Sequence, residues 1–88
     1  MKEFGKDILR QLFGLSKARD GEIVFSRLTV SRMNEYQISG KTIQNVFRFG
    51  REDKPGMIIQ KFNAYSVGLY YKYDHAEGKY LITTCWKQ

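Results

Sequence analysis

The chain has 88 residues, of which 42% are hydrophobic and 27% are charged. This composition is ordinary for a globular protein and excludes a disordered or collagen-like chain. A chain of this length forms one small domain, so we treat residues 1–88 as a single folding unit. Its net charge of +6 is spread along the chain, which favours a folded basic face and nucleic acid as a partner. A basic surface that serves solubility alone accounts for the charge equally well.

The sequence also limits the location and the cofactors of the protein. Cys85 is the only cysteine, so no disulfide can form within the chain, and a reducing, cytoplasmic location is expected. No apolar run approaches the roughly 20 residues of a membrane span, so no membrane partner is expected. One cysteine and one histidine, His75, cannot supply the ligands of a tetrahedral zinc site. We therefore predict no metal and no cofactor.

Hydrophobic periodicity predicts a leading helix over residues 1–18. Phe4, Ile8, Leu12 and Leu15 recur at the 3.6-residue period of an amphipathic helix. This helix packs on the domain's own sheet, or it forms a homodimer or partner surface, because its apolar stripe is wide for so small a domain.

Residues 22–50 are predicted to form a short strand, or an extended entry segment, followed by two helices. Ser26 is placed as the N-cap of the first helix, which ends near Tyr36. Ser39 caps the second helix, which ends at Gly50. The residues of the second helix that we expect to be buried are Ile43, Val46 and Phe47.

Residues 57–87 are predicted to form a β-meander of three strands, and residues 51–56 before it a loop, because Pro55-Gly56 is a strong turn signal. In the middle strand, alternation places Tyr65, Val67, Leu69, Tyr71 and Tyr73 on one face, and Ser66, Gly68, Tyr70 and Lys72 on the other. In the last strand, alternation places Leu81, Thr83 and Cys85 on one face, and Tyr80, Ile82, Thr84 and Trp86 on the other. These patterns predict an α+β fold of two layers, with the leading helix and two short helices packed on a three- to four-stranded antiparallel sheet.

Residues 26–39 resemble the opening signature of a widespread bacterial family. The family pattern is a serine, a basic residue, histidine, alanine, two variable residues, arginine-methionine, a variable residue, glutamate-arginine-glycine-isoleucine, and serine or threonine. The positions that match it are Ser26, Arg27, Arg32, Met33, Glu35, Ile38 and Ser39. Residues 82–86 resemble its closing strand, so the resemblance covers roughly residues 23–87. The family is an uncharacterised domain-of-unknown-function group allied in shape to the RelE and BrnT-type endoribonuclease toxins, which implies a RelE/BrnT-like fold and action on RNA.

The chain departs from this signature at three positions. Leu28 stands where the family has its histidine, and Tyr36 and Gln37 replace its second arginine and its glycine. If the histidine serves catalysis in relatives, this chain lacks it. Whether the protein is an enzyme is therefore left open.

Candidate site residues follow from the chemistry of RNA cleavage. Without a metal, cleavage needs a base, a cation for the phosphate and an acid for the leaving oxygen, and the resemblance implies that arginine, lysine and tyrosine supply them. The catalytic candidates are Arg32, Arg48, Tyr71 and Thr84, and the RNA-binding candidates are Arg27, Arg51, Lys61, Lys72, Tyr73 and Lys87. Other interpretations are that Arg48 and Arg51 stabilise a helix C-terminus, and that Arg32 forms a surface pair with Glu35.

Aromatic residues interleaved with lysines are the stronger signal for nucleic acid. The aromatic residues are Tyr65, Tyr70, Tyr71, Tyr73, Tyr80 and Trp86, and the lysines are Lys61, Lys72, Lys79 and Lys87. Exposed rings of this kind stack on unpaired bases while lysines meet phosphates. Because strand residues alternate between two faces, we expect about half of the rings to lie in the core.

Three functions remain open from the sequence. The first is a metal-independent endoribonuclease of a toxin–antitoxin type that acts on RNA or the ribosome. The second is a non-catalytic member of the same fold that binds RNA or a protein partner, with Leu28 as its motivating observation. The third is a small interaction, inhibitor or regulatory protein, phage- or plasmid-borne, that uses the leading helix to dimerise. The protein partner that we expect is an antitoxin or another protein.

Overall fold

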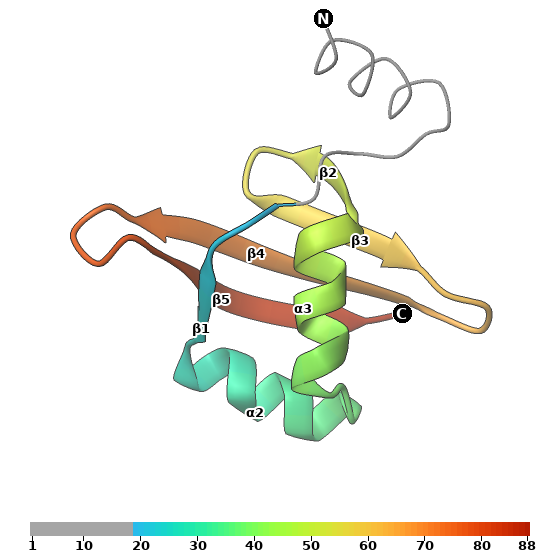
Figure 1. Cartoon of the computed structure of the whole chain (residues 1–88). Coiled ribbons are helices and arrows are strands. Elements are labelled where there is room, and N and C mark those ends of the chain that lie inside the picture. Colours follow the sequence, from blue (N-terminus) through green and yellow to red (C-terminus); the bar gives the residue numbers. More distant parts are fainter. Residues whose placement is uncertain (1–18) are drawn as a thin grey trace, which may run out of the picture.

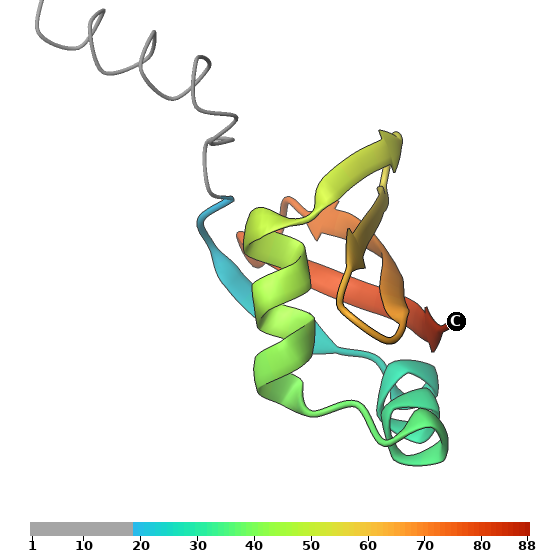
Figure 2. The same ribbon diagram turned by 90° about the vertical axis from the view of Figure 1, so that its right-hand side faces the viewer.

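Within residues 19–88, two helices lie on one face of a five-stranded sheet, and no helix of this part of the chain lies on the other face (Figures 1 and 2). The computed structural model describes residues 19–88, so the predicted leading helix and its predicted dimer role lie outside the described residues. The elements are β1 Glu22–Phe25, α2 Arg27–Tyr36, α3 Gly40–Phe49, β2 Arg51–Lys54, β3 Met57–Lys61, β4 Ser66–Asp74 and β5 Lys79–Lys87. The predicted α+β class is confirmed.

The sheet differs from the predicted antiparallel meander in two respects. Its strand order is β1-β5-β4-β3-β2, and β1 runs parallel to β5 while the other pairs are antiparallel. The prediction of an all-antiparallel sheet of three to four strands is therefore wrong, because pairing between segments far apart in the chain leaves no mark in local periodicity. The predicted loop before the meander contains β2, whose four residues are all charged and exposed and therefore look like loop.

One bulge in β5 overturns the faces predicted for that strand. Tyr71 pairs with Ile82 but Tyr70 pairs with Thr84, so Thr83 is an extra residue opposite β4. The alternation shifts by one at this point. As a result, Ile82 and Cys85 both face the helices and are buried, whereas strict alternation had separated them. The faces predicted for β4 are confirmed, with Val67 and Leu69 fully buried.

Helix α2 is attached to this bulge by its first turn. Ser26 is its N-cap, accepting from the backbone N–H of Thr29 at 3.0 Å and donating from Oγ to the carbonyl of Thr83 at 2.9 Å. The hydroxyl of Thr29, fully buried, donates to the carbonyl of Ile82 at 2.6 Å. Two consecutive carbonyls of β5 are thus bound by hydroxyls at the start of α2, and the carbonyl of Ile82 also accepts from the backbone N–H of Ser26 at 3.1 Å. Cys85 is buried beside them, with Sγ 3.8 Å from the carbonyl oxygen of Thr29.

Helix α3 supplies the centre of the core. Ser39 caps its N-terminus as predicted, and Ile43, Val46 and Phe47 are fully buried against the sheet. At its C-terminal end the carbonyls of Phe47 and Gly50 accept from Nη1 of Arg19 at 2.9 and 3.0 Å. The sequence analysis proposed Arg48 and Arg51 as the cations at the C-terminus of this helix. The side chain that binds its terminal carbonyls is instead that of Arg19, which precedes β1 in the chain.

The buried Thr29 hydroxyl gives a test of how α2 is held. We expect Thr29→Val to destabilise the fold by about 0.5–1.5 kcal/mol, because the shape is kept while the carbonyl of Ile82 loses one of its two donors and keeps the backbone N–H of Ser26. Thr42 is the matched control, since it stands in the same relation to Ser39 as Thr29 does to Ser26 but its contact is exposed. Urea unfolding of both variants measures the difference. Equal midpoints for Thr29→Val and Thr42→Val would show that the carbonyl contact is not stabilising.

Candidate functional site

The helix-free face is the side of the sheet opposite α2 and α3. Residues paired across antiparallel strands point to the same face, so the register assigns every side chain to one side. One row across this face runs from Arg51 through Ile59 and Gly68 to Trp86, and the next runs from Lys54 through Met57 and Tyr70 to Thr84. The remaining residues of the face are Lys61 with Ser66, Lys72 with Leu81 and Val24, and Asp74 with Lys79 and Glu22.

The centre of the helix-free face is an indole ring that lies over a glycine. A Cβ added at Gly68 would overlap ring atoms of Trp86, so only glycine leaves room for the ring in this position. Gly68 is buried while Trp86 is half-buried, which means that the ring covers the backbone with one side and keeps part of its surface exposed. The ring therefore offers a supported aromatic surface.

Tyr70 extends this aromatic surface along the sheet. Its ring centroid lies 5.4 Å from that of Trp86, with 44° between the ring planes, and the residue is 39% exposed. Met57 and Ile59, its neighbours on β3, are buried and half-buried respectively. Apolar side chains thus support two rings that remain accessible from solvent.

Four cationic residues lie on the same face of the sheet as the two rings. Arg51, Lys54, Lys61 and Lys72 are all exposed, and they lie on this face of three different strands. Arg51 contacts Asp53 at 3.3 Å, but its side chain remains 78% exposed. An open depression of about 420 Å³ lies at this end of the face, lined by Arg51, Ile59, Lys61, Ser66 and Gln88. Cations and an aromatic surface therefore occur together.

The four catalytic candidates do not gather at one place. Arg32 lies on α2 and pairs with Glu35 at 3.2 Å, as the alternative interpretation predicted. Arg48 donates to the carbonyls of Arg19 at 2.9 Å and Gly21 at 3.4 Å, on the helix side of the molecule. Tyr71 and Thr84 lie on opposite faces of the sheet, because Tyr71 pairs beside the core and Thr84 pairs with Tyr70.

The RNA-binding candidates divide into two groups. Arg51, Lys61 and Lys72 lie on the helix-free face together with Thr84. The others are Arg27 in the first turn of α2, and Tyr73 and Lys87 on the helix side of the sheet. The ring centroids of Tyr73 and Tyr80 are 4.8 Å apart, and Nζ of Lys87 lies 4.5 Å from the centroid of the Tyr65 ring.

Two residues of the helix-free face were not picked out from the sequence. Lys54 belonged to the segment predicted as a loop, and Gly68 was treated only as one position of an alternating strand. A glycine inside a strand of otherwise large residues often marks a close approach of another group, and this signal would have indicated Gly68. Tyr70 and Trp86 were recognised among the interleaved aromatic residues.

Tyr71 belongs to a polar cluster on the helix side. Its hydroxyl donates to Oε2 of Glu52 at 3.0 Å, and the same oxygen accepts from the backbone N–H of Gly56. Burial, followed by the hydrogen bond to Glu52, raises the pKa of the Tyr71 phenol above its ordinary value. The phenol therefore holds its proton near neutral pH, and it can act as a hydrogen-bond donor or an acid but not as a base.

The structure provides no obvious metal site in the described part of the chain. Within residues 19–88, no three histidine, cysteine, aspartate or glutamate side chains are grouped so that they could hold a metal ion. None of the helices described there has the length and apolar character needed to cross a membrane.

The chain matches no protein-family model, no curated protein and no solved structure. The likeness to the RelE and BrnT-type toxins therefore stays a prediction, and the function has to be inferred from the site itself.

The raised pKa of Tyr71 predicts a pH-dependent loss of stability. Because the folded state holds this proton more tightly than the unfolded state, the stabilisation is complete below the ordinary tyrosine pKa of about 10 and is lost as the pH rises through the raised value. We expect the advantage of the native chain over Tyr71→Phe, measured by urea unfolding, to shrink over the range above about pH 10. Glu52→Gln, which keeps a hydrogen-bonding side chain without its charge, should show a weaker pH dependence. An advantage that is constant over this range would contradict the assignment.

Proposed function

We propose that the protein binds single-stranded RNA on its helix-free face and that it does so without cleaving it. The observation that carries the proposal is the Trp86 ring lying over Gly68, with Tyr70 beside it and cations on the same face. An aromatic ring of this kind stacks on an unpaired base of any sequence, and arginine or lysine side chains pair with the phosphates.

A single strand suits this face better than a duplex. Bases in a duplex are already stacked on one another, so the rings of Trp86 and Tyr70 can reach only bases that are unpaired. The row of cross-strand neighbours from Arg51 to Trp86 runs across four strands, so a cation lies at one end of the row and an aromatic ring at the other. A nucleotide lying along this row has its base over the indole and its phosphate toward Arg51 or Lys61.

Binding is favoured over catalysis because the catalytic candidates are dispersed. Cleavage needs an acid, a base and a cation around one phosphate. Arg48 is engaged with backbone carbonyls, Tyr71 holds its proton on the helix side, and Thr84 lies on the opposite face. The endoribonuclease of a toxin–antitoxin type is the alternative, supported by the family resemblance and opposed by Leu28.

Removal of the aromatic surface should weaken RNA binding strongly. We expect Trp86→Ala and Tyr70→Ala each to lower the affinity by about 5- to 150-fold, since stacking contributes about 1–3 kcal/mol per base. The measurement is fluorescence anisotropy with a labelled, unstructured RNA of about 12 nucleotides, a length that covers such a site. Tyr73→Ala is the matched control, because Tyr73 is a similarly exposed tyrosine on the other face. If all three variants bind alike, the helix-free face is not the RNA site.

The glycine allows a second variant that removes no side chain. Gly68→Ala places a methyl group where the indole lies, so the ring has to move away from β4. Trp86 is the only tryptophan, and its own fluorescence therefore reports this movement as well as quenching by a stacked base. We expect Gly68→Ala to shift the emission and to weaken RNA binding. Gly40→Ala, at the start of α3, where an added Cβ meets only ordinary contacts, should leave both unchanged.

Salt dependence and RNA integrity complete the test. For a single strand, the slope of log affinity against log salt is about −0.7 per phosphate contact, so Arg51→Gln and Lys61→Gln should each make it shallower by about that amount. The same RNA, analysed by gel electrophoresis with and without ribosomes, decides between binding and cleavage. Intact RNA agrees with the proposal, and specific cleavage by the native chain would replace it with the endoribonuclease. Absence of RNA binding would leave a protein partner.

A further inference from the structure

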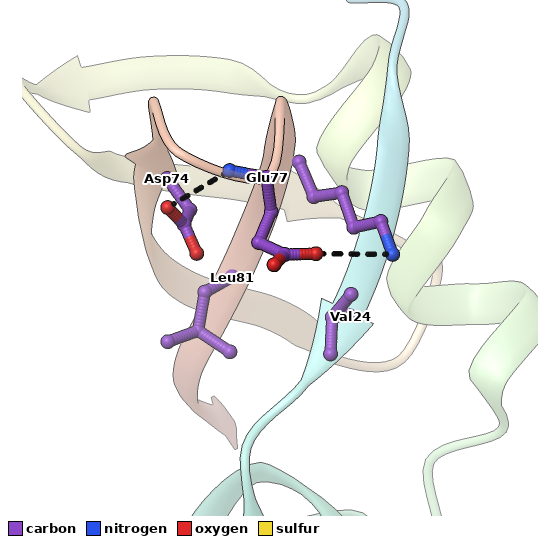
Figure 3. A pocket seen from close by; sticks show the side chains of 5 residues that line it. Val24, Asp74, Glu77 and Leu81 are labelled. Atoms are coloured by element: carbon purple, nitrogen blue, oxygen red, sulfur yellow. Dashed lines mark hydrogen bonds and ion pairs between the residues drawn. The ribbon is translucent and has the colours of Figure 1, made fainter.

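A pocket lies at the other end of the helix-free face, beside the edge strand β1 (Figure 3). It has a volume of about 220 Å³ and is lined by Val24, Leu81, Asp74, Glu77 and Lys79. The two apolar side chains come from neighbouring strands, and the charged ones come from the hairpin between β4 and β5. Val24 is 40% exposed, so the apolar part of the pocket is open to solvent.

The charge around this pocket is opposite to that of the whole chain. Lys79 lies 3.8 Å from both Glu22 and Glu77, so its charge is shared between two carboxylates. Asp74 accepts two backbone N–H groups of the hairpin turn and contributes a further negative charge. The carboxylates here are those of Glu22, Asp74 and Glu77, and they outnumber the ammonium groups of Lys79 and of Lys72, which pairs with Leu81. This excess of negative charge occurs in a protein of net charge +6. The pocket therefore attracts a cation that carries an apolar stem.

The outer edge of β1 borders the same pocket. Ser26 directs its N–H to the carbonyl of Ile82, and backbone groups of a strand alternate in direction, so those of Ile23 and Phe25 point away from β5. No strand of the described part of the chain pairs with this edge. Such an edge is a template for one more strand.

The two edges of the sheet are not equivalent. At the opposite edge, every residue of β2 is charged, and the strand has an irregular register with β3, both of which discourage pairing with another chain. The sequence of β1 has one charged and three apolar residues. Only the β1 edge has these features of a docking strand.

We propose that an extended segment of a partner protein adds to the outer edge of β1 and places a lysine or arginine side chain in the adjoining pocket. The backbone of the segment pairs with Ile23 and Phe25, which gives affinity without sequence preference. The aliphatic stem of its basic residue covers Val24 and Leu81, and its charged end meets Asp74 and Glu77. The inference is independent of RNA binding, because it uses the other end of the sheet.

The test uses two synthetic peptides of alternating threonine and valine, identical except for a central lysine or a central glutamate. Titrated into the isotope-labelled full chain and followed by NMR, the lysine peptide should shift the amides of Ile23, Phe25 and Leu81 and bind at least about fivefold tighter than the glutamate peptide. Equal affinities, shifts centred on β2 and β3, or no binding at millimolar peptide would each overturn the proposal.

Two lysine substitutions locate the site. Val24→Lys puts a cation into the pocket and should weaken the lysine peptide at least about fivefold. Leu28→Lys is the matched control, since Leu28 is an apolar residue of similar exposure, 49%, that does not line the pocket. The spectrum of each variant verifies folding. Equal weakening of peptide binding by both substitutions would contradict the site. If the native chain sediments as a dimer and the Val24→Lys variant as a monomer, the occupant is a second copy of this chain and the proposal of a partner protein is overturned.

Discussion

The hydroxyl groups of Ser26 and Thr29 bind two consecutive carbonyls of β5, and the rest of the structure depends on this contact. The contact occupies the bulge at Thr83, where the ladder between β4 and β5 loses its regular partners. The bulge in turn decides which side chains of β5 face which layer. Ile82 and Cys85 enter the core, and Trp86 is left on the opposite face above Gly68. A core contact of α2 thus sets the position of the ring on which the proposed function rests.

Local patterns in the sequence predicted much of the fold, and pairing between distant segments could not be predicted. The serine caps and the apolar spacing of Ile43, Val46 and Phe47 were sufficient to place both helices. The parallel pairing of β1 with β5 joins segments far apart in the chain, for which periodicity carries no information. Strand β2 was missed because its charged residues are typical of loops, although in an edge strand such residues prevent pairing with other chains.

The sequence predicted the types of residue at the candidate site, but not which of them lie together on one face of the sheet. Interleaved rings and lysines indicated nucleic acid, but alternation alone could not sort them once a bulge had shifted the last strand. In β4, Tyr70 and Lys72 lie on the helix-free face, whereas Tyr71 and Tyr73, their neighbours in sequence, lie on the helix side because strand residues alternate. The helix-free face that results has two unlike ends, a cationic aromatic end near Arg51 and an acidic apolar end near Asp74. Under the two proposals, these ends of one sheet surface bind two ligands of different chemistry.

The parallel pairing of β1 with β5 has a consequence for the order of events during biosynthesis. Glu22 pairs with Lys79, so the first described strand has no partner until the last one has been made. Helix α2 also cannot dock before β5 has been synthesised, because the carbonyls that bind its first turn belong to Ile82 and Thr83. The hairpins from β2 to β4 are local and can form earlier, whereas closure of the core requires contacts of high sequence separation, which form slowly. A nascent chain that stalls before residue 79 therefore exposes its apolar helix face to chaperones and proteases.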